Sequence, residues 1–306
     1  MRQNEKDHRV AVVFFSLQTM PIFSTIHIAL VGSLLSLAPA LQAHEFWFAP
    51  VASPQATGDT VNLRLEVGEF FTGEAAGFSI PSTQTLRHYS AGQPPQDLRP
   101  SLPPDAPEAE VSLALDTPGT HLLTYDSTAL RITLEAGTFH AYLHDEGLDF
   151  VKTQREQAGN ANKAGRERYR RHIKTLIGVG PLTKAVQALD RTYAIHAGQR
   201  LELTPLHNPL ALAPGDTLPL KITFDNRPLV GALVKAWHKH KGQLVTIRAT
   251  TSAQGEVAFN LPYAGDWMVS VVHMIPAAGD DAEGVDWDSF WGNLSFHVVG
   301  APSQRQ

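Results

Sequence analysis

The histidines carry the most distinctive chemistry in this chain, and His44 is the first of them after an apolar N-terminal stretch. If cleavage follows Ala43, His44 becomes the first residue, and its free amine and imidazole offer two nitrogen ligands to one metal ion. A further histidine would complete a T-shaped site suited to Cu(II) or Ni(II). Because the amine must lose its proton to bind, metal affinity should rise with pH. The alternative is that His44 only begins the first strand.

Three histidines in the C-terminal half are further candidate ligands. His238 and His240 form an H-x-H pair on an expected strand, whose period of two places both imidazoles on one face. His273 ends another apolar face and precedes Met274, whose thioether suits copper or fills a core. If consecutive strands simply reverse direction, the H-x-H pair and His273 lie at opposite ends of the sheet. The predicted metal ligands are therefore His44, His238, His240 and His273, with their convergence left open.

Two other groups of polar residues are weaker candidates. His140 and His144 are four residues apart and have no third ligand nearby, so we interpret them as surface or half-buried histidines. An acidic segment is a candidate for a hard cation such as calcium, but its spacing lacks the EF-hand pattern, and we expect a solvated loop. Its carboxylates are Asp280, Asp281, Glu283, Asp286 and Asp288.

Residues 1–43 resemble a secretory leader. A basic start is followed by the mostly apolar stretch 26–37 and by two small-residue cleavage sites, after Ala40 and after Ala43. Cleavage would place the protein in the periplasm. An uncleaved leader would act as a membrane anchor, although its apolar run is shorter than the roughly 20 residues that a membrane span needs.

Charge and composition narrow the class of function. The chain has a formal net charge of −5, and removing the leader, with three cations and two anions, makes it −6. Such a mild excess argues against nucleic acid or an anionic membrane surface as a partner. There are 0 cysteines, so neither disulfides nor thiolate ligands are available. No motif of a hydrolase, nucleotide enzyme or zinc protease is present, which favours binding over catalysis.

Hydrophobic periodicity predicts an all-β protein. Alternation at 61–67 and many short apolar runs separated by turns are typical of a sandwich. The expected strands also include 85–89, 111–115, 121–125, 130–134, 139–143, 218–224, 233–240, 244–251, 256–261, 266–273 and 290–298. We predict two immunoglobulin-like or prealbumin-like sandwiches, at 44–148 and 201–300, with a tail at 301–306.

The segment 149–200 is predicted to be a helical connector between the two sandwiches. Tyr169, Ile173, Leu176 and Ile177 follow a period near 3.6, which is typical of one face of a helix. The basic residues among them are expected to form a solvated face. These are Arg166, Arg168, Arg170, Arg171 and Lys174.

Several stretches together resemble the bacterial DUF4198 proteins, often named as NikM-like or CbiK-like periplasmic components of cobalt or nickel uptake. The similar stretches are 44–47, 139–148, 168–176, 202–209, 228–232, 272–274 and 286–291. The resemblance implies an exported β-rich protein that hands a divalent transition metal to a membrane transporter. His44 and His273 lie within these stretches, whereas His238 and His240 do not.

The sequence thus predicts an exported protein that binds Ni, Co or Cu without catalysis and serves a membrane metal transporter. Two alternatives remain open. A copper ion held by an N-terminal histidine can activate O₂, which would make the protein a copper oxidase, or the protein can be a copper carrier. The other alternative is a sandwich that binds a non-metal ligand or a partner protein.

Overall fold

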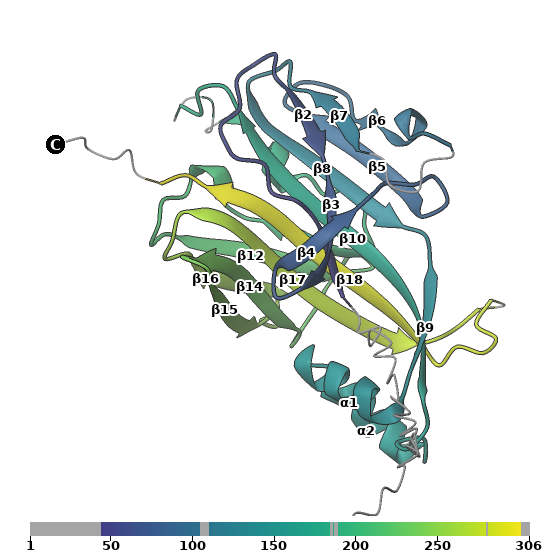
Figure 1. Ribbon diagram of the computed structural model, residues 1–306. Coiled ribbons are helices and arrows are strands. Elements are labelled where there is room, and N and C mark those ends of the chain that lie inside the picture. Colours follow the sequence, from purple (N-terminus) through teal and green to yellow (C-terminus); the bar gives the residue numbers. More distant parts are fainter. Residues whose placement is uncertain (1–43, 105–109, 184–185, 187–188, 280, 301–306) are drawn as a thin grey trace, which may run out of the picture. The chain divides into compact units, whose positions relative to one another are not determined.

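The computed structural model describes residues 44–104, 110–183, 186, 189–279 and 281–300 (Figure 1). Strands dominate these residues, which confirms the all-β class. The predicted signal peptide, residues 1–43, and the tail, residues 301–306, lie outside the described residues. Among the residues described, no helix has both the length and the apolar character needed to cross a membrane.

A nine-stranded sheet forms the centre of the fold, with the order β15-β14-β17-β18-β10-β8-β5-β6 and β9 paired to β10. In Figure 1, β10 runs between β8 and β18. β10 is parallel to β18 and antiparallel to β8. The strands are β5 (Thr83–Ser90), β6 (Gln96–Asp97), β8 (Gly119–Ser127), β9 (Leu130–Leu134), β10 (Gly165–Val179), β14 (Leu233–His240), β15 (Gln243–Thr250), β17 (Gly265–Pro276) and β18 (Trp287–Val298).

Three smaller sheets complete the β structure. The first consists of β1 (Glu45–Phe48), β3 (Leu65–Glu69) and β4 (Thr72–Ala76), and the second of β2 (Thr60–Leu63) and β7 (Val111–Ala114). The third consists of β11 (Leu201–Pro205), β12 (Thr217–Phe224), β13 (Arg227–Pro228) and β16 (Glu256–Asn260). The short 3-10 helices are η1 (Arg99–Ser101), η2 (Thr192–Ala194) and η3 (Pro209–Ala211).

The predicted helix around residues 169–177 is wrong. All of these residues lie in β10, whose side chains alternate between two cores. Ile173 and Ile177 pack with the N-terminal strands, whereas Leu176 packs with the C-terminal ones. The apolar residues follow no single strand face because β10 is buried on both faces from His172 to Val179. Of the basic residues predicted to be solvated, Arg168 and Lys174 are buried and Arg166 is exposed, a difference that local sequence does not reveal.

Of the two helices that the structure describes in full, one lies before the predicted helical connector, 149–200, and the other lies at its start. α1 (Ala136–Asp145) replaces the strand expected at 139–143, and α2 (Asp149–Gln157) follows directly. Phe139 and Leu143 are buried on α1, and Val151 is buried on α2. They form a separate apolar cluster with the ends of β17 and β18. The two helices therefore cover one end of the central sheet.

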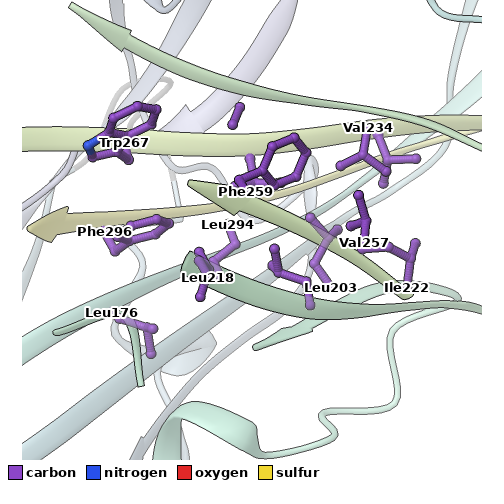
Figure 2. Close-up of a cluster of buried hydrophobic side chains, with 14 of the residues drawn as sticks. Leu176, Leu203, Leu218, Ile222, Val234, Val257, Phe259, Trp267, Leu294 and Phe296 are labelled. Atoms are coloured by element: carbon purple, nitrogen blue, oxygen red, sulfur yellow. The ribbon is translucent and has the colours of Figure 1, made fainter. Parts of the chain in front are cut away.

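The largest apolar core lies between the central sheet and the sheet that contains β11, β12 and β16 (Figure 2). Leu218 and Phe259 from the smaller sheet face Trp267 and Leu294 from the central sheet, and all four are at most 1% exposed. At roughly 25 cal/mol per Å² of buried apolar area, such face-to-face packing is a main source of stability. A second core joins β2 and β7 to β5, β8 and β10.

The central sheet is continuous across the predicted division into sandwiches at 44–148 and 201–300. β5 and β8 come from the first part, β14, β15, β17 and β18 come from the second, and β10 joins them. β1 lies against the same sheet, because two side chains of β18 donate hydrogen bonds to its backbone. The Asn293 side-chain amide donates to the carbonyl of Phe46 at 2.7 Å, and the Ser295 hydroxyl donates to the carbonyl of Phe48 at 2.9 Å. The first strand is thus fixed to the last one.

Candidate functional site

His44 lies directly before β1, and its side chain is 38% exposed. In the β1–β3 pair Glu45 lies opposite Gly68, so His44 falls opposite Glu69. The His44 Nδ1 atom is 3.7 Å from a carboxylate oxygen of Glu69 and has no hydrogen-bond partner among the described residues. Arg171 donates to the backbone carbonyl of His44 at 3.0 Å. The fold therefore fixes the backbone of His44 and aims its imidazole at a carboxylate.

His238 and His240 end β14, where aromatic side chains surround them. The His238 ring is stacked at 4.6 Å from Trp267, and its Nδ1 donates to the backbone carbonyl of Asp266 at 2.8 Å. The His240 ring is stacked at 3.8 Å from Tyr263. Burial lowers the pKa of His238. The two imidazoles share one face of the strand, as predicted, with ring centroids 6.2 Å apart.

His273 lies toward the other end of the central sheet. In β17 it comes six residues after Trp267, the partner of His238 across the sheet. At about 3.3 Å per residue this places the two histidines about 20 Å apart, which confirms the predicted opposite ends. The ring packs edge-on against Phe224 at 4.5 Å, and burial lowers the pKa of His273 to about 4.

The predicted ligands therefore do not converge as one set. In the part of the chain that the structure describes, no group of three or more His, Asp or Glu side chains is placed to hold a metal ion. His140 and His144 lie on α1, where the His144 Nδ1 is 3.1 Å from Asp149 at the surface. Of the candidates, only His44 pairs its imidazole with an acidic side chain beside a cavity.

That cavity has a volume of about 690 Å³. It lies between the β3–β4 hairpin, α1, and the strands β14 and β15. Its charged lining residues are Glu45, Glu69, Asp145, Glu146, Lys235 and Arg248, and its aromatic ones are Phe70, Tyr142 and Trp237. Because these residues come from β1, the β3–β4 hairpin, α1 with its C-terminal end, β14 and β15, only the tertiary structure brings them together.

Glu45 contributes a buried carboxyl group to this cavity, since the residue is only 9% exposed. The Trp237 indole donates to the Ser270 hydroxyl at 2.8 Å, and Ser270 in turn donates to Oε1 of Glu45 at 3.0 Å. The second oxygen, Oε2, is buried without a partner among the described residues. Burial, reinforced by the nearby charge of Glu146, raises the pKa of Glu45 to about 8. A carboxyl group with this pKa is mostly protonated at pH 7.

An ion pair lies in the lining of the cavity. The Lys235 ammonium is 2.8 Å from a carboxylate oxygen of Glu146, and their side chains are 5% and 13% exposed. The same ammonium is 5.5 Å from the ring centre of Trp237, within the range of a cation–π interaction. Burial raises the pKa of Glu146, while the charge of Lys235 opposes that rise. The pair thus compensates two charges that would be costly to bury singly.

The β3–β4 hairpin presents a strained turn to the cavity. Glu69 pairs with Thr72, so Phe70 and Phe71 are the two central turn residues, and both have φ of 54°. Such positions normally hold Asn or Gly, and a bulky residue there costs about 1 kcal/mol or more. Phe71 is buried against Trp47, with ring centres 5.6 Å apart, which compensates part of that cost. Phe70 is instead 55% exposed and lines the cavity.

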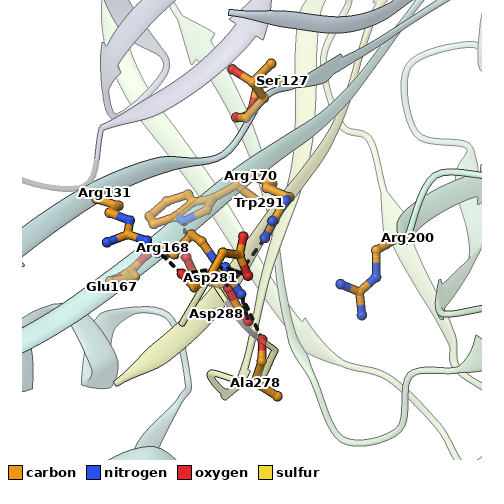
Figure 3. A network of polar contacts seen from close by, with 12 residues as sticks. Ser127, Arg131, Glu167, Arg168, Arg170, Arg200, Ala278, Asp281, Asp288 and Trp291 are labelled. Atoms are coloured by element: carbon orange, nitrogen blue, oxygen red, sulfur yellow. Dashed lines mark hydrogen bonds and ion pairs between the residues drawn. The ribbon is translucent and has the colours of Figure 1, made fainter. Parts of the chain in front are cut away.

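The arginines of β10 meet the acidic segment that precedes and begins β18 (Figure 3). Arg168 binds Asp288 through two hydrogen bonds of 2.6 and 2.8 Å and also contacts Asp281. Arg166 forms the corresponding pair with Asp286 at 2.6 Å. The solvated basic face and the solvated acidic loop predicted from the sequence are therefore wrong at Arg168 and Asp288, which are buried, whereas Arg166 and Asp281 are exposed. These ion pairs hold β10 to the segment at the start of β18, so we interpret them as stabilising the fold.

Glu167 is a second buried carboxyl group, close to the cavity but not in its lining. It accepts a hydrogen bond from the Ser289 hydroxyl, and the Tyr142 hydroxyl is 3.5 Å away. Burial raises the pKa of Glu167 to about 7. Tyr142 lines the cavity and is stacked on Trp291, with ring centres 5.6 Å apart. A layer of aromatic and hydroxyl groups thus separates Glu167 from the cavity.

Sequence reasoning missed Glu45, Glu146 and Lys235. One signal was present, because Glu45 and Glu146 lie inside two of the stretches that carry the family resemblance. Lys235 alternates with Val234 and Ala236 in β14, and such a pattern normally indicates one face in solvent. Here α1 and β1 cover that second face, so the lysine is buried. Nothing local in the sequence of β14 indicates this.

No curated protein matches the chain. Among solved structures, the FN1–FN3 domains of chicken CNTN1 match at 8% identity and TM-score 0.18, covering 82% of this chain and 66% of that one. Trypsin-activated alpha-2-macroglobulin from Escherichia coli matches at 12% identity and a TM-score of 0.20. The match covers 85% of this chain and 17% of that one. Three N-terminal domains of the bacteriophage RB49 outer capsid protein Hoc match at 10% identity and a TM-score of 0.19. The match covers 84% of this chain and 71% of that one. Scores this low carry no argument about the fold.

The structure defines a mostly β protein, built on one long mixed sheet with a lined cavity at the hairpin that follows its first strand. The family described as "Domain of unknown function (DUF4198)" matches residues 41–275, which is most of the chain. The chain therefore belongs to the DUF4198 family, as the resembling stretches indicated.

Proposed function

We propose that the protein is exported and binds one divalent transition metal ion, Ni, Co or Cu, at His44 without catalysing a reaction. The observation that carries this proposal is the 3.7 Å separation between His44 Nδ1 and the Glu69 carboxylate. Two ligand atoms that are each about 2.0–2.2 Å from a metal ion are themselves about 3–4 Å apart. A metal ion therefore fits between these two atoms with little movement of either side chain.

The donor set supports a borderline transition metal. Cleavage after Ala43 would add the His44 amine, which forms a six-membered chelate ring with Nδ1 of the same residue. Two nitrogens and one carboxylate oxygen suit Cu(II), Ni(II) or Co(II), and the oxygen replaces the second histidine expected from the sequence. His238, His240 and His273 have aromatic neighbours elsewhere and take no part in this proposal.

The proposed role is to present the metal ion to a membrane transporter in the periplasm. The partial exposure of His44 and Glu69, at 38% and 37%, supports such a role because both side chains remain accessible to a partner. Membership of the DUF4198 family is compatible with this role.

The test begins with the intact mass and N-terminal residue of the exported protein. The chain that starts at His44 is then titrated calorimetrically with Ni(II), Co(II) and Cu(II), beside His44→Ala and beside a chain with one extra N-terminal alanine. The extra alanine keeps the imidazole but removes the histidine amine. We expect one equivalent of metal to bind to the chain that starts at His44 and both changes to abolish tight binding. Equal binding by all three chains would overturn the proposal, and copper-dependent oxygen consumption with ascorbate would indicate an oxidase.

A further inference from the structure

We infer that the cavity beside β1 binds a small organic cation, namely a protonated amine on an aliphatic or aromatic body. This cavity shares Glu69 with the proposed metal site, but the His44 side chain is not part of its lining. The inference goes beyond the proposed function and does not depend on it.

The charges of the lining favour a cation. Four carboxyl side chains, Glu45, Glu69, Asp145 and Glu146, face two cationic ones, Lys235 and Arg248. Lys235 and Glu146 neutralise each other at 2.8 Å. Even without Glu45, which is mostly protonated, Glu69 and Asp145 outnumber Arg248 around a partly enclosed space, where electrostatic attraction is stronger than in bulk water.

The buried carboxyl group of Glu45 marks the position of the amine. One of its oxygens is satisfied by Ser270, while the other is buried without a partner in the described part of the chain. Buried polar atoms in folded proteins are nearly always hydrogen-bonded, so an unpaired oxygen on a residue that lines a cavity points to a missing donor. An ammonium group has three donors and no acceptor, which matches this requirement.

Aromatic side chains complete the recognition of a cation with an apolar body. The ring of Trp237 already lies 5.5 Å from one ammonium, that of Lys235. Phe70 approaches Trp237 edge-on with ring centres 6.3 Å apart, and it is held there by the strained turn. Strain of this kind persists where the surrounding structure imposes it and often marks a binding site. An exposed phenylalanine at the cavity can cover the apolar part of the ligand.

The test uses three probes with related bodies: 2-phenylethylammonium, the neutral 2-phenylethanol and the anion phenylacetate. Each is titrated calorimetrically into the mature protein in the presence of a chelator, so that no metal ion contributes. We expect the ammonium to bind at least about tenfold more tightly than either of the other probes, as loss of a charged partner implies. Preference for the anion or for the neutral probe, or no binding by any of the three, would overturn the inference.

Variants locate the binding and separate it from metal binding. Glu45→Gln keeps the shape of the side chain but replaces one carboxyl oxygen with an NH₂ group, which cannot accept a hydrogen bond from an ammonium, and we expect about tenfold weaker ammonium binding. Phe70→Asn serves as a second variant that should fold, because asparagine tolerates positive φ and Phe70 is exposed. It too should weaken binding, by a few fold. Val230→Asn, at another exposed apolar residue, should leave binding unchanged.

His44→Ala distinguishes this inference from the proposed function. The variant should lose metal binding and keep ammonium binding, because the His44 side chain does not line the cavity. Unchanged ammonium affinity in both Glu45→Gln and Phe70→Asn would contradict the inference even if metal binding at His44 were demonstrated.

Discussion

Arg168 and Asp288 lie directly opposite each other in the parallel pair of β10 and β18, 120 residues apart in the chain. Their side chains form two hydrogen bonds, of 2.6 and 2.8 Å, and are only 5% and 7% exposed. A planar guanidinium matches a carboxylate in this two-bond geometry, which fixes both the distance and the register of the strands. The relationship joins the two halves of the chain at the centre of the main sheet.

Asp288→Asn should destabilise the fold strongly. It leaves Arg168 buried with the exposed Asp281 and the backbone carbonyl of Ala278 as partners, and breaking a buried ion pair costs about 3–5 kcal/mol in the free energy of unfolding. Urea denaturation monitored by circular dichroism measures the loss. The matched control is Asp225→Asn. Asp225 pairs with Arg200 at the surface, where the two side chains are 49% and 44% exposed, and such a pair contributes about 1 kcal/mol or less to the free energy of unfolding. Similar losses in the two variants would show that Arg168 is not buried as described.

Glu167→Gln should reduce the dependence of stability on pH. The folded pKa of Glu167, about 7, lies above its ordinary value of 4.5, so the folded state binds the proton more tightly. Stability from this group is therefore complete below about pH 4.5 and is lost as pH rises to about 7, by about 3 kcal/mol. We expect the variant to resemble the wild type at pH 5 and to be more stable at pH 8. The comparison is made by urea midpoints at both pH values.

Part of the pH dependence should remain in that variant, because Glu45 has a folded pKa of about 8. Glu74→Gln, at an exposed residue of β4, is the matched control and should follow the wild type at both pH values. A wild-type stability that rises between pH 5 and pH 8 would contradict the assignment of Glu167 and Glu45 as protonated buried groups.

Glu69→Gln tests the proposed third metal ligand. If the Glu69 carboxylate binds the metal ion held by His44, its amide substitute should weaken affinity by about tenfold or more. The measurement is a Ni(II) or Cu(II) titration of chains that begin at His44. Glu74→Gln, in the paired strand β4, again serves as control and should bind as the wild type does. Equal affinity in wild type and Glu69→Gln would assign the third position to another ligand or to water.

Two glycines at the start of β10 and in α1 should respond oppositely to alanine. A Cβ atom at Gly165 would lie 2.4 Å from ring carbons of Phe139, whereas one at Gly137 has no neighbour within 4 Å. Gly165→Ala should therefore cost about 1–3 kcal/mol of unfolding free energy. Gly137→Ala should add about 0.5–1 kcal/mol, since alanine has the higher helix propensity. Thermal unfolding of both variants measures the difference, and equal melting temperatures would contradict the packing of Phe139 on β10.

Local sequence patterns were sufficient to predict a strand where its apolar residues alternate with polar ones and turns lie at both ends. The prediction for 233–240 agrees with β14, and that for 130–134 agrees with β9. The pattern failed at β10, because Arg168 and Lys174 are buried there by partners distant in the chain, Asp288 and Glu202. It failed again at Phe139, where apolar residues suited either a strand or a helix.

For the candidate site too, some features were evident from the sequence and others only from the tertiary structure. The sequence by itself indicated the β class, the family and His44 as a residue of interest, because composition, periodicity and motif order are properties of contiguous residues. Only the tertiary structure brought Glu69 to His44 and assembled Glu45, Glu146, Lys235 and Phe70 around one cavity. The physical reason is that strand pairing and ion pairing join residues far apart in the chain, and their energies depend on burial that no single segment determines.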